Sequence, residues 1–220
     1  MILNSVTPSP LTHMPCQKSY TQKFVSTTRT TTTITTTPTS TSITTTTKTT
    51  QARSANYGKN GNQKLIGAGT TGGCWSECPK GAVPSGAVIG GQRNGLTLYI
   101  IRVSYAGGCY PSGAFSQNET GVVFGYGGRT ITGNNFQCLT GSGTSFRWIT
   151  VSGPCTSDKV GTNTAVVQGG WEADGTALLI AQVSMTSGLN CGRVKWNDYA
   201  YIATTSGEQK FETYAVLAFA

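Results

Sequence analysis

A block of sequence that occurs twice places the strongest constraint on what this chain can fold into. Each copy has a short apolar stretch that ends in two glycines, then a polar turn, then a long apolar run. The first copy begins at Ala87-Val88-Ile89-Gly90-Gly91 and the second at Val166-Val167-Gln168-Gly169-Gly170, with a period of 78 to 80 residues. A repeat of this length indicates two similar units that bury a shared core.

The turn in each copy has the composition of a tight hairpin. It reads Gln92-Arg93-Asn94-Gly95 in the first copy and Trp171-Glu172-Ala173-Asp174-Gly175 in the second. Asn-Gly and Asp-Gly provide the positive φ angles that such turns need. The paired glycines before each turn predict a bend or a close approach of another backbone.

Residues 65–220 contain strand-like runs separated by glycine clusters, without a helical period. We expect strands at Leu96–Tyr105, Gly121–Tyr126, Ser145–Val151, Thr176–Met185, Tyr199–Ala203 and Tyr214–Phe219. The fold class is therefore predicted to be all-β. Two tandem, pseudo-symmetric antiparallel β-repeats, residues 65–147 (including a linker) and 148–220, are expected to form one compact domain.

Residues 1–64 differ sharply in composition. Threonine occupies 17 of the 25 positions from Ser26 to Thr50, and the segment has seven basic residues and no acidic one. Too few apolar side chains are present to offset the entropy of ordering, so we expect a disordered basic tail. Both an O-glycosylated stalk and a plain flexible tail fit this composition. The charges are too dispersed, and too poor in aromatic neighbours, for specific nucleic-acid binding.

Several chemistries are excluded. The one histidine, His13, lies in the tail, which argues against a Ser-His-Asp triad or a catalytic zinc held by histidine. No apolar run is long enough for a membrane-spanning helix. Residues 67–72 fit G-x-G-x-x-G but lack the strand and helix of a dinucleotide site. We expect no cofactor, no metal and no enzymatic activity.

Six cysteines lie in the β-region, and their state has three interpretations. They are Cys74, Cys78, Cys109, Cys138, Cys155 and Cys191. An even set in a glycine-rich β-domain favours up to three disulfides, whereas reduced thiols or a four-cysteine zinc site are the alternatives. Asn118 begins a glycosylation sequon on an expected loop.

The order of these blocks resembles the DM-nine repeat family. The resemblance rests on Ala-Val-x-Gly-Gly, the Asn-Gly or Asp-Gly turn, the run from Leu98 to Arg102, a later glycine block, and closing strands at Phe136–Leu139 and Tyr214–Leu217. It covers residues 75–139 and 148–219. It implies a compact all-β unit with pseudo-twofold symmetry. Some members of the family are mannose-binding lectins of invertebrate immunity.

In that family an acidic residue in the turn and a lysine in the glycine block are associated with sugar binding. The resemblance places Glu172, Asp174 and Arg193 at these positions in the second repeat. In the first repeat it places Arg93, Asn94 and Ala114 there, so acid and base are both lost. Trp171 could cover the apolar face of a sugar ring. Glu172 and Arg193 could instead form a surface ion pair of little energetic value.

Arg102 has two interpretations, a ligand in the first repeat or an outward-facing residue at the rim. From these residues we expect a non-enzymatic, mannose-type carbohydrate-binding module with glycans as partners, and homodimerisation as the source of avidity. The alternative is a disulfide-stapled adhesive protein on a Thr-rich stalk. The cysteines favour an extracellular location, although no clear signal peptide is present and a cytoplasmic location is the alternative.

Overall fold

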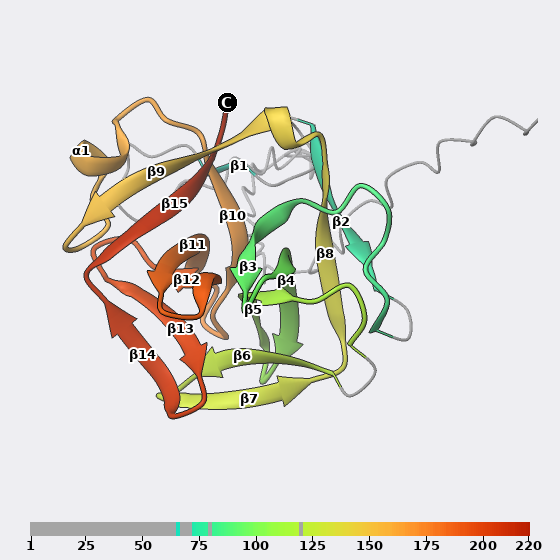
Figure 1. The fold of residues 1–220 in the computed structure, drawn as a ribbon. Coiled ribbons are helices and arrows are strands. Elements are labelled where there is room, and N and C mark those ends of the chain that lie inside the picture. The colour runs from blue at the N-terminus through green and yellow to red at the C-terminus, as the bar shows by residue number, and fades with distance from the viewer. Residues whose placement is uncertain (1–64, 67–71, 79–80, 119–120) are drawn as a thin grey trace, which may run out of the picture. The chain divides into compact units, whose positions relative to one another are not determined.

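The structure, a computed structural model, describes residues 65–66, 72–78, 81–118 and 121–220. The chain divides into two units, and every described residue belongs to the first; the second, Tyr20–Ala55, lies outside the described residues. The expectations of a disordered tail and of a linker across residues 67–71 therefore fall outside the described part. The described residues form an all-β, mostly antiparallel fold, as predicted (Figure 1).

Fourteen strands divide evenly between the two repeats. The first repeat has β2 (Gly73–Glu77), β3 (Ile89–Arg93), β4 (Leu96–Tyr105), β5 (Gly108–Ala114), β6 (Val122–Tyr126), β7 (Arg129–Gly133) and β8 (Phe136–Gly141). The second has β9 (Phe146–Ser152), β10 (Val166–Trp171), β11 (Ala177–Met185), β12 (Gly188–Val194), β13 (Ala200–Thr204), β14 (Gly207–Phe211) and β15 (Thr213–Phe219). A short β1 (Leu65–Ile66) pairs in parallel with β10, and a helix, α1 (Ser157–Val160), follows β9.

The two repeats share most of their strand pairings, although the fourth strand pairs with the fifth only in the second repeat, as β12 does with β13. In each repeat the first strand pairs with the last, the second with the third, the third with the fourth, and the fifth with the sixth. The third strand also pairs with the last, as β4 does with β8 and β11 with β15. The duplication inferred from sequence is thus a duplication of topology.

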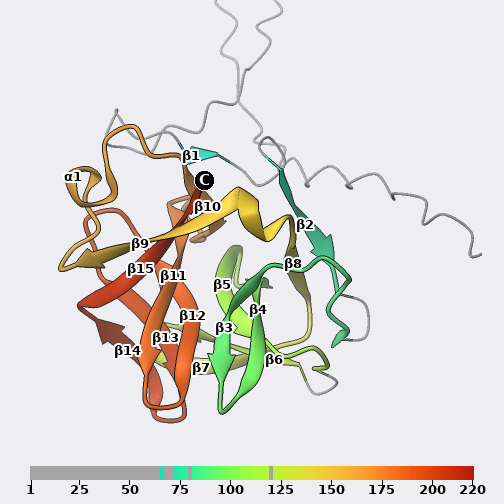
Figure 2. The ribbon, with the colours of Figure 1, turned by 45° about the horizontal axis from the view of Figure 1, so that its top comes forward.

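The paired glycines are where the two repeats meet. Both β3 and β10 are bulged at their glycines. A Cβ atom at Gly91 would overlap the carbonyl oxygen of Leu189, and one at Gly170 would overlap that of Cys109. Since Leu189 lies on β12 and Cys109 on β5, each repeat presses its bulge against a strand of the other. Figure 2 shows the β3–β4 hairpin beside the β11–β12 hairpin.

A second reciprocal contact joins the β6–β7 and β13–β14 hairpins (Figure 1). Thr130 on β7 donates a hydrogen bond to the carbonyl of Thr204, 2.7 Å away. In the other direction, the backbone N–H of Gly128 donates to the Glu208 carboxylate on β14, at 3.1 Å. Thr130 and Glu208 occupy equivalent positions, because each is the second residue of the second strand of its hairpin. Thr130 pairs with Gly125, and Glu208 pairs with Ala203.

The core runs through both repeats. One cluster of buried side chains combines Ile100 and Leu139 of the first repeat with Val167, Ile180 and Leu217 of the second. Separate clusters fill each repeat on either side of it. Because the central cluster draws on both halves, neither repeat closes its own core.

The strands predicted from sequence are confirmed to within one residue at each end. The internal alignment needs one correction. Arg193 pairs with Ile180, and the residue that pairs with the equivalent Ile100 is Gly113, not Ala114. Gly113 therefore stands where the second repeat has Arg193.

Candidate functional site

The turn after β10 forms as predicted and fixes the start of the candidate site. The N–H of Glu172 donates to the Thr176 carbonyl at 2.8 Å, and the N–H of Gly175 returns to the Glu172 carbonyl at 2.9 Å. Gly175 has the expected positive φ of 83°. The Asp174 carboxylate accepts a hydrogen bond from the Thr176 N–H at 2.8 Å, so part of its role is to shape the turn.

Arg193 lies at the centre of a buried ion-pair network. Its Nε and Nη2 donate to the two carboxylate oxygens of Glu208, at 2.9 and 3.0 Å, and its Nη1 donates to Glu172 at 3.0 Å. Tyr201 places its ring 5.0 Å from the guanidinium carbon. Arg193 is only 8% exposed. Arg193 is therefore not a surface residue, and its two-pronged pair is with the buried Glu208. Its pair with Glu172 is a single contact to a carboxylate whose side chain is 22% exposed.

Glu208 escaped the sequence analysis. Its side chain is 2% exposed, and it is held from the opposite repeat by the N–H of Gly128. A Cβ at Gly125 would overlap the Glu208 carboxylate, so the glycine in β6 makes room for it. Glu208 reaches Arg193 only because β12, β13 and β14 pair side by side. The spacing of these residues along the chain does not predict the contact between Arg193 and Glu208.

Lys195 is the second residue that the sequence analysis missed, although a signal was present. Its Nζ lies 3.7 Å from Glu172 and 3.9 Å from Asp198. It follows Arg193 by two residues and lies one residue beyond the end of β12. The corner thus has a lysine beside its turn carboxylate, just past the strand that contains Arg193.

We call the group formed by Glu172, Arg193, Lys195, Asp198 and Glu208 the acidic corner. Its inner members are Arg193 and Glu208, whereas the side chains of Glu172 and Lys195 are 22% and 33% exposed. Tyr110 of the first repeat is buried beside it. Burial, and then the charge of Glu172, raise the pKa of Tyr110, so its hydroxyl stays protonated.

The equivalent place in the first repeat has a different chemistry, and we call Arg93, Asn94 and Asn190 the basic corner. Arg93 donates from Nε to the Asn190 side chain at 2.6 Å. Asn94 has a positive φ of 50° and donates its N–H to the Ser187 carbonyl at 2.7 Å. Asn94 therefore serves the turn, and these hydrogen bonds join side chains and backbone without any carboxylate.

Trp171 and Arg102, both proposed as ligand residues, meet each other rather than the acidic corner. The guanidinium of Arg102 lies 5.4 Å from the Trp171 ring and 4.4 Å from the Trp75 ring. It donates twice to Gln137, at 2.8 and 2.6 Å, and Gln137 donates to Glu77. Arg102 is 8% exposed, so the outward-facing interpretation is wrong. The indole of Trp171 is committed to this stack, which stabilises the contact between the repeats.

The cysteines confirm the expectation of disulfide bonding, below its upper bound of three. Cys78 and Cys138 form a disulfide with their Cα atoms 6.5 Å apart. Cys109, Cys155 and Cys191 are free and buried. Burial raises the pKa of the Cys155 and Cys191 thiols to about 12. Among the described residues no group of three or more His, Cys, Asp or Glu side chains is arranged to hold a metal ion.

Asn118 is a poor site for a glycan in this fold. It is 9% exposed, and its Nδ2 donates to the carbonyls of Gly81 and Phe115, at 3.2 and 2.6 Å. Both hydrogens of the amide are therefore used, and a glycan on Nδ2 would displace one of these bonds. Glycosylation of Asn118 therefore stays a prediction, and in the folded chain the side chain is buried and hydrogen-bonded.

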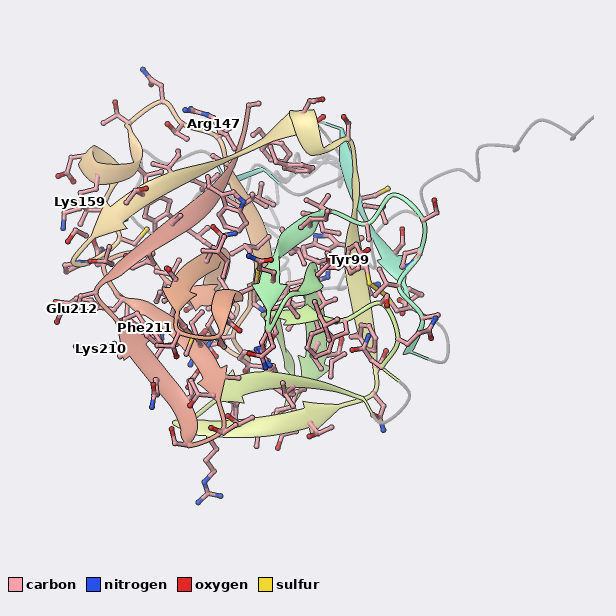
Figure 3. All side chains as sticks on the ribbon, in the orientation of Figure 1. Tyr99, Arg147, Lys159, Lys210, Phe211 and Glu212 are labelled. Carbon is pink, nitrogen blue, oxygen red and sulfur yellow. A yellow bond between two sulfur atoms is a disulfide. The ribbon has the colours of Figure 1, made fainter. Side chains whose placement is uncertain are left out.

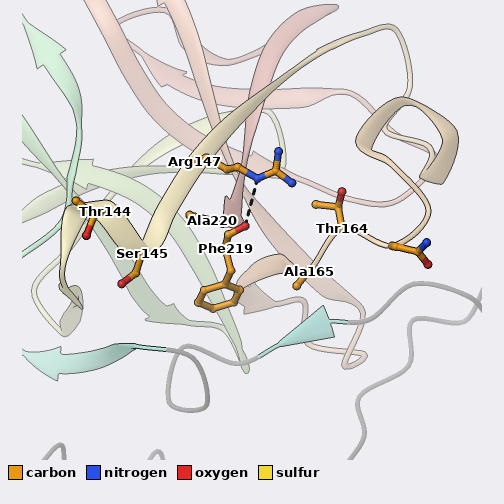
Figure 4. Close-up of a pocket in the computed structure, with 8 residues that line it drawn as sticks. Thr144, Ser145, Arg147, Thr164, Ala165, Phe219 and Ala220 are labelled. Atoms are coloured by element: carbon orange, nitrogen blue, oxygen red, sulfur yellow. Dashed lines mark hydrogen bonds between the residues drawn. The ribbon is translucent and has the colours of Figure 1, made fainter.

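A pocket of about 610 Å³ opens elsewhere, beside the end of β15 (Figure 4). It is lined by Thr144, Ser145, Arg147, Asn163, Thr164, Ala165, Phe219 and Ala220. Arg147 donates from Nε to the Phe219 carbonyl across it, at 3.3 Å. None of the residues proposed from sequence lies there. This pocket and the acidic corner thus lie at different places, and the charged side chains favour the acidic corner as the candidate site.

Fold and corner together define a class: an all-β protein built from two copies of one unit, with charged side chains where the copies meet. Residues 92–211 match the DM9 repeat, more than half of the chain, and the chain belongs to the DM9 repeat family. This confirms the resemblance found in the sequence.

Among solved structures the chain is similar to the nematode sperm cell motility protein MFP2B, with a TM-score of 0.47 and 14% identity. The match covers 67% of this chain and 46% of that one, so it spans less than half of that protein. No curated protein sequence matches the chain. In the part that the structure describes, no helix is both long and apolar enough to cross a membrane.

Proposed function

We propose that this DM9 repeat protein binds neutral, mannose-type sugars at the acidic corner, through Glu172 and Lys195. The observation that carries the proposal is the division of that corner into two layers. Arg193 and Glu208 are buried and fix the position of Glu172, whereas Glu172 and Lys195 reach solvent. A side chain held rigidly by buried partners loses little entropy when a ligand arrives.

The chemistry of the exposed layer suits a sugar. A carboxylate accepts hydrogen bonds from two neighbouring hydroxyls, and an ammonium donates to a third oxygen. Asp174 lies in the same turn, two residues from Glu172, and adds a second carboxylate at the edge. A single site of this size gives affinities of roughly micromolar to millimolar strength. Useful avidity then requires two sites in one particle, which is why we also propose a homodimer.

The DM9 repeat family is not a known enzyme family. The lectin members named by the resemblance support the proposal for this chain. The Cys78–Cys138 disulfide supports an extracellular location, with recognition of glycans outside the cell as the biological role.

The test is a glycan array with the full chain, followed by calorimetry with methyl α-mannoside. Glu172→Gln and Lys195→Met should each weaken binding at least tenfold, because each removes a charged hydrogen-bonding partner of the sugar. Asp174→Asn should weaken it less. Asp158→Asn, an exposed change on α1, serves as the control and should have no effect. Unchanged binding in both Glu172→Gln and Lys195→Met would remove the site.

A second candidate is a structural or adhesive protein without sugar binding. It is supported by the commitment of Arg193 to Glu172 and Glu208, which explains all three of its hydrogen bonds without a ligand. A folded chain that binds no glycan on the array would favour this function.

A further inference from the structure

The acidic corner has a charge balance that bears on which sugars it accepts. Its ion pairs join three carboxylates, Glu172, Asp198 and Glu208, to two cations, Arg193 and Lys195. The corner therefore has a net charge of about −1, and Asp174 in the adjoining turn adds a further negative charge. Tyr110 contributes none, since burial raises the pKa of its hydroxyl.

Glu208 supplies the negative charge by which the ion-paired group exceeds neutrality. Without that charge, Arg193 and Lys195 would offset Glu172 and Asp198. Asp174 in the adjoining turn would then supply the one remaining negative charge. Glu208 is also the member furthest from solvent, with 2% of its side chain exposed. It cannot touch a sugar bound at Glu172 and Lys195, so any effect that it has on the ligand is electrostatic or structural.

The position of Glu208 is set by the first repeat rather than by its own. The N–H of Gly128 donates to one oxygen of the carboxylate, and the glycine at position 125 provides the space for it. The backbone also closes there, because the N–H of Glu208 donates to the Gly128 carbonyl at 3.2 Å. The β6–β7 hairpin thus holds the carboxylate against Arg193.

We propose that Glu208 makes the site selective for the charge of the sugar. Its buried carboxylate neutralises Arg193 and leaves the acidic corner with a net negative charge. Neutral sugars therefore bind there and acidic sugars are rejected. This inference rests on the proposed function and extends it. Arginine paired with a carboxylate ligand is a common means of binding acidic sugars. Here Nε and Nη2 of Arg193 already donate to the Glu208 carboxylate. The carboxylate of a uronic acid would therefore meet a net negative charge.

The experiment compares two methyl glycosides that differ in charge. One is methyl α-mannoside, and the other is the methyl α-glycoside of mannuronic acid with its carboxylate free. The full chain should bind the neutral sugar at least tenfold more tightly. Glu208→Gln keeps the shape of the side chain and removes its charge. It should reduce the preference by about tenfold, because a unit charge within several ångströms of a partly buried ligand has an effect of that order. If Glu208→Gln only loosened the fold, it would weaken the binding of both sugars equally. The ratio of the two affinities would then stay unchanged, which would contradict the role given to Glu208.

The matched control is Glu212→Gln, which removes the same charge at the margin of the body, where the side chain points outward (Figure 3). It should leave the ratio as it is. A wild-type chain that binds mannuronate as tightly as mannoside would overturn the inference and leave the proposed function standing. A chain that binds neither sugar, nor any other on the array, would remove the proposed function and this inference with it.

A second measurement serves if Glu208→Gln does not fold. The preference of the wild-type chain is measured as salt rises from about 20 mM to about 500 mM, over which the screening length falls from roughly 20 Å to roughly 4 Å. A preference caused by charge should shrink. A preference that stays constant would show that shape excludes the acid, and would refute the role given to Glu208.

Discussion

The acidic and basic corners occupy equivalent places in two copies of one fold, and they differ in what holds them together. The acidic corner depends on charge: Arg193 is paired with two carboxylates and almost wholly buried. The basic corner uses hydrogen bonds from Arg93 to Asn190, and from Asn190 to the Ser187 hydroxyl and the Gly188 carbonyl. Gly113 stands where the acidic corner has Arg193, and Thr130 where it has Glu208. The backbone of a repeat therefore does not require the ion pairs, which points to a role for them beyond folding.

The disulfide is the largest difference between the repeats, and removing it should have the largest effect. Cys78 and Cys138 are separated by 60 residues, so the chain-entropy model gives a contribution of about 4 kcal/mol to the free energy of unfolding. The double variant Cys78→Ala, Cys138→Ala should lose about that much in urea unfolding. Hydrogen exchange should speed up in β2 and β8 and stay slow in β9 and β15. Equal acceleration in both pairs would mean that the repeats do not respond separately.

The paired glycines should show the opposite, an equal effect in both repeats. Gly91→Ala and Gly170→Ala each place a Cβ against a backbone carbonyl of the other repeat, and backbone cannot move aside cheaply. Each should cost about 3 kcal/mol in the free energy of unfolding. Gly143→Ala is the control, because a Cβ there meets nothing within 4 Å. A large effect in only one repeat would break the pseudo-symmetry of packing.

Equivalent substitutions at the contact between the hairpins should also affect the two repeats differently. The difference in the free energy of unfolding should be smaller than the effect of removing the disulfide. Glu208→Ala leaves a buried Arg193 with one remaining partner, Glu172, and should cost about 3 kcal/mol in thermal or urea unfolding. Thr130→Ala, the equivalent change, removes one hydrogen bond to the Thr204 carbonyl and should cost about 1 kcal/mol. Similar costs for the two variants would show that the ion pair contributes no more than an ordinary hydrogen bond.

Local sequence was sufficient for the strands and for the turn at Asp174-Gly175. β4 begins and ends where its apolar run does, since alternation and turn residues are read along the chain. The family resemblance singled out Glu172 and Arg193 as sugar-binding residues, and their ion pair was the alternative interpretation. Lys195 was within reach of the same reasoning, because it is only two residues from Arg193 in the sequence.

The rest depended on contacts that no spacing encodes. Glu208 meets Arg193 and Gly128 only after three strands and the opposite hairpin are in place. The same holds for Trp171, whose ring meets Arg102 of the other repeat. Which cysteines bond depends on the distances between their Cα atoms in the fold, as the Cys78–Cys138 disulfide shows.

The way each bulge presses on the opposite repeat has a consequence for how such a protein can evolve. At Gly91 and Gly170 the groups in contact are the carbonyl oxygens of Leu189 and Cys109, which every amino acid supplies. Gly90 and Gly169 lie instead against the side chains of Cys191 and Pro111. Part of the contact between the two halves therefore survives substitution of side chains on β5 and β12. One copy can accumulate new surface chemistry while its neighbour keeps the old, and the union between them survives. In a duplicated chain of this kind, one corner can lose its binding residues, or gain different ones, while the structure of the other corner is preserved.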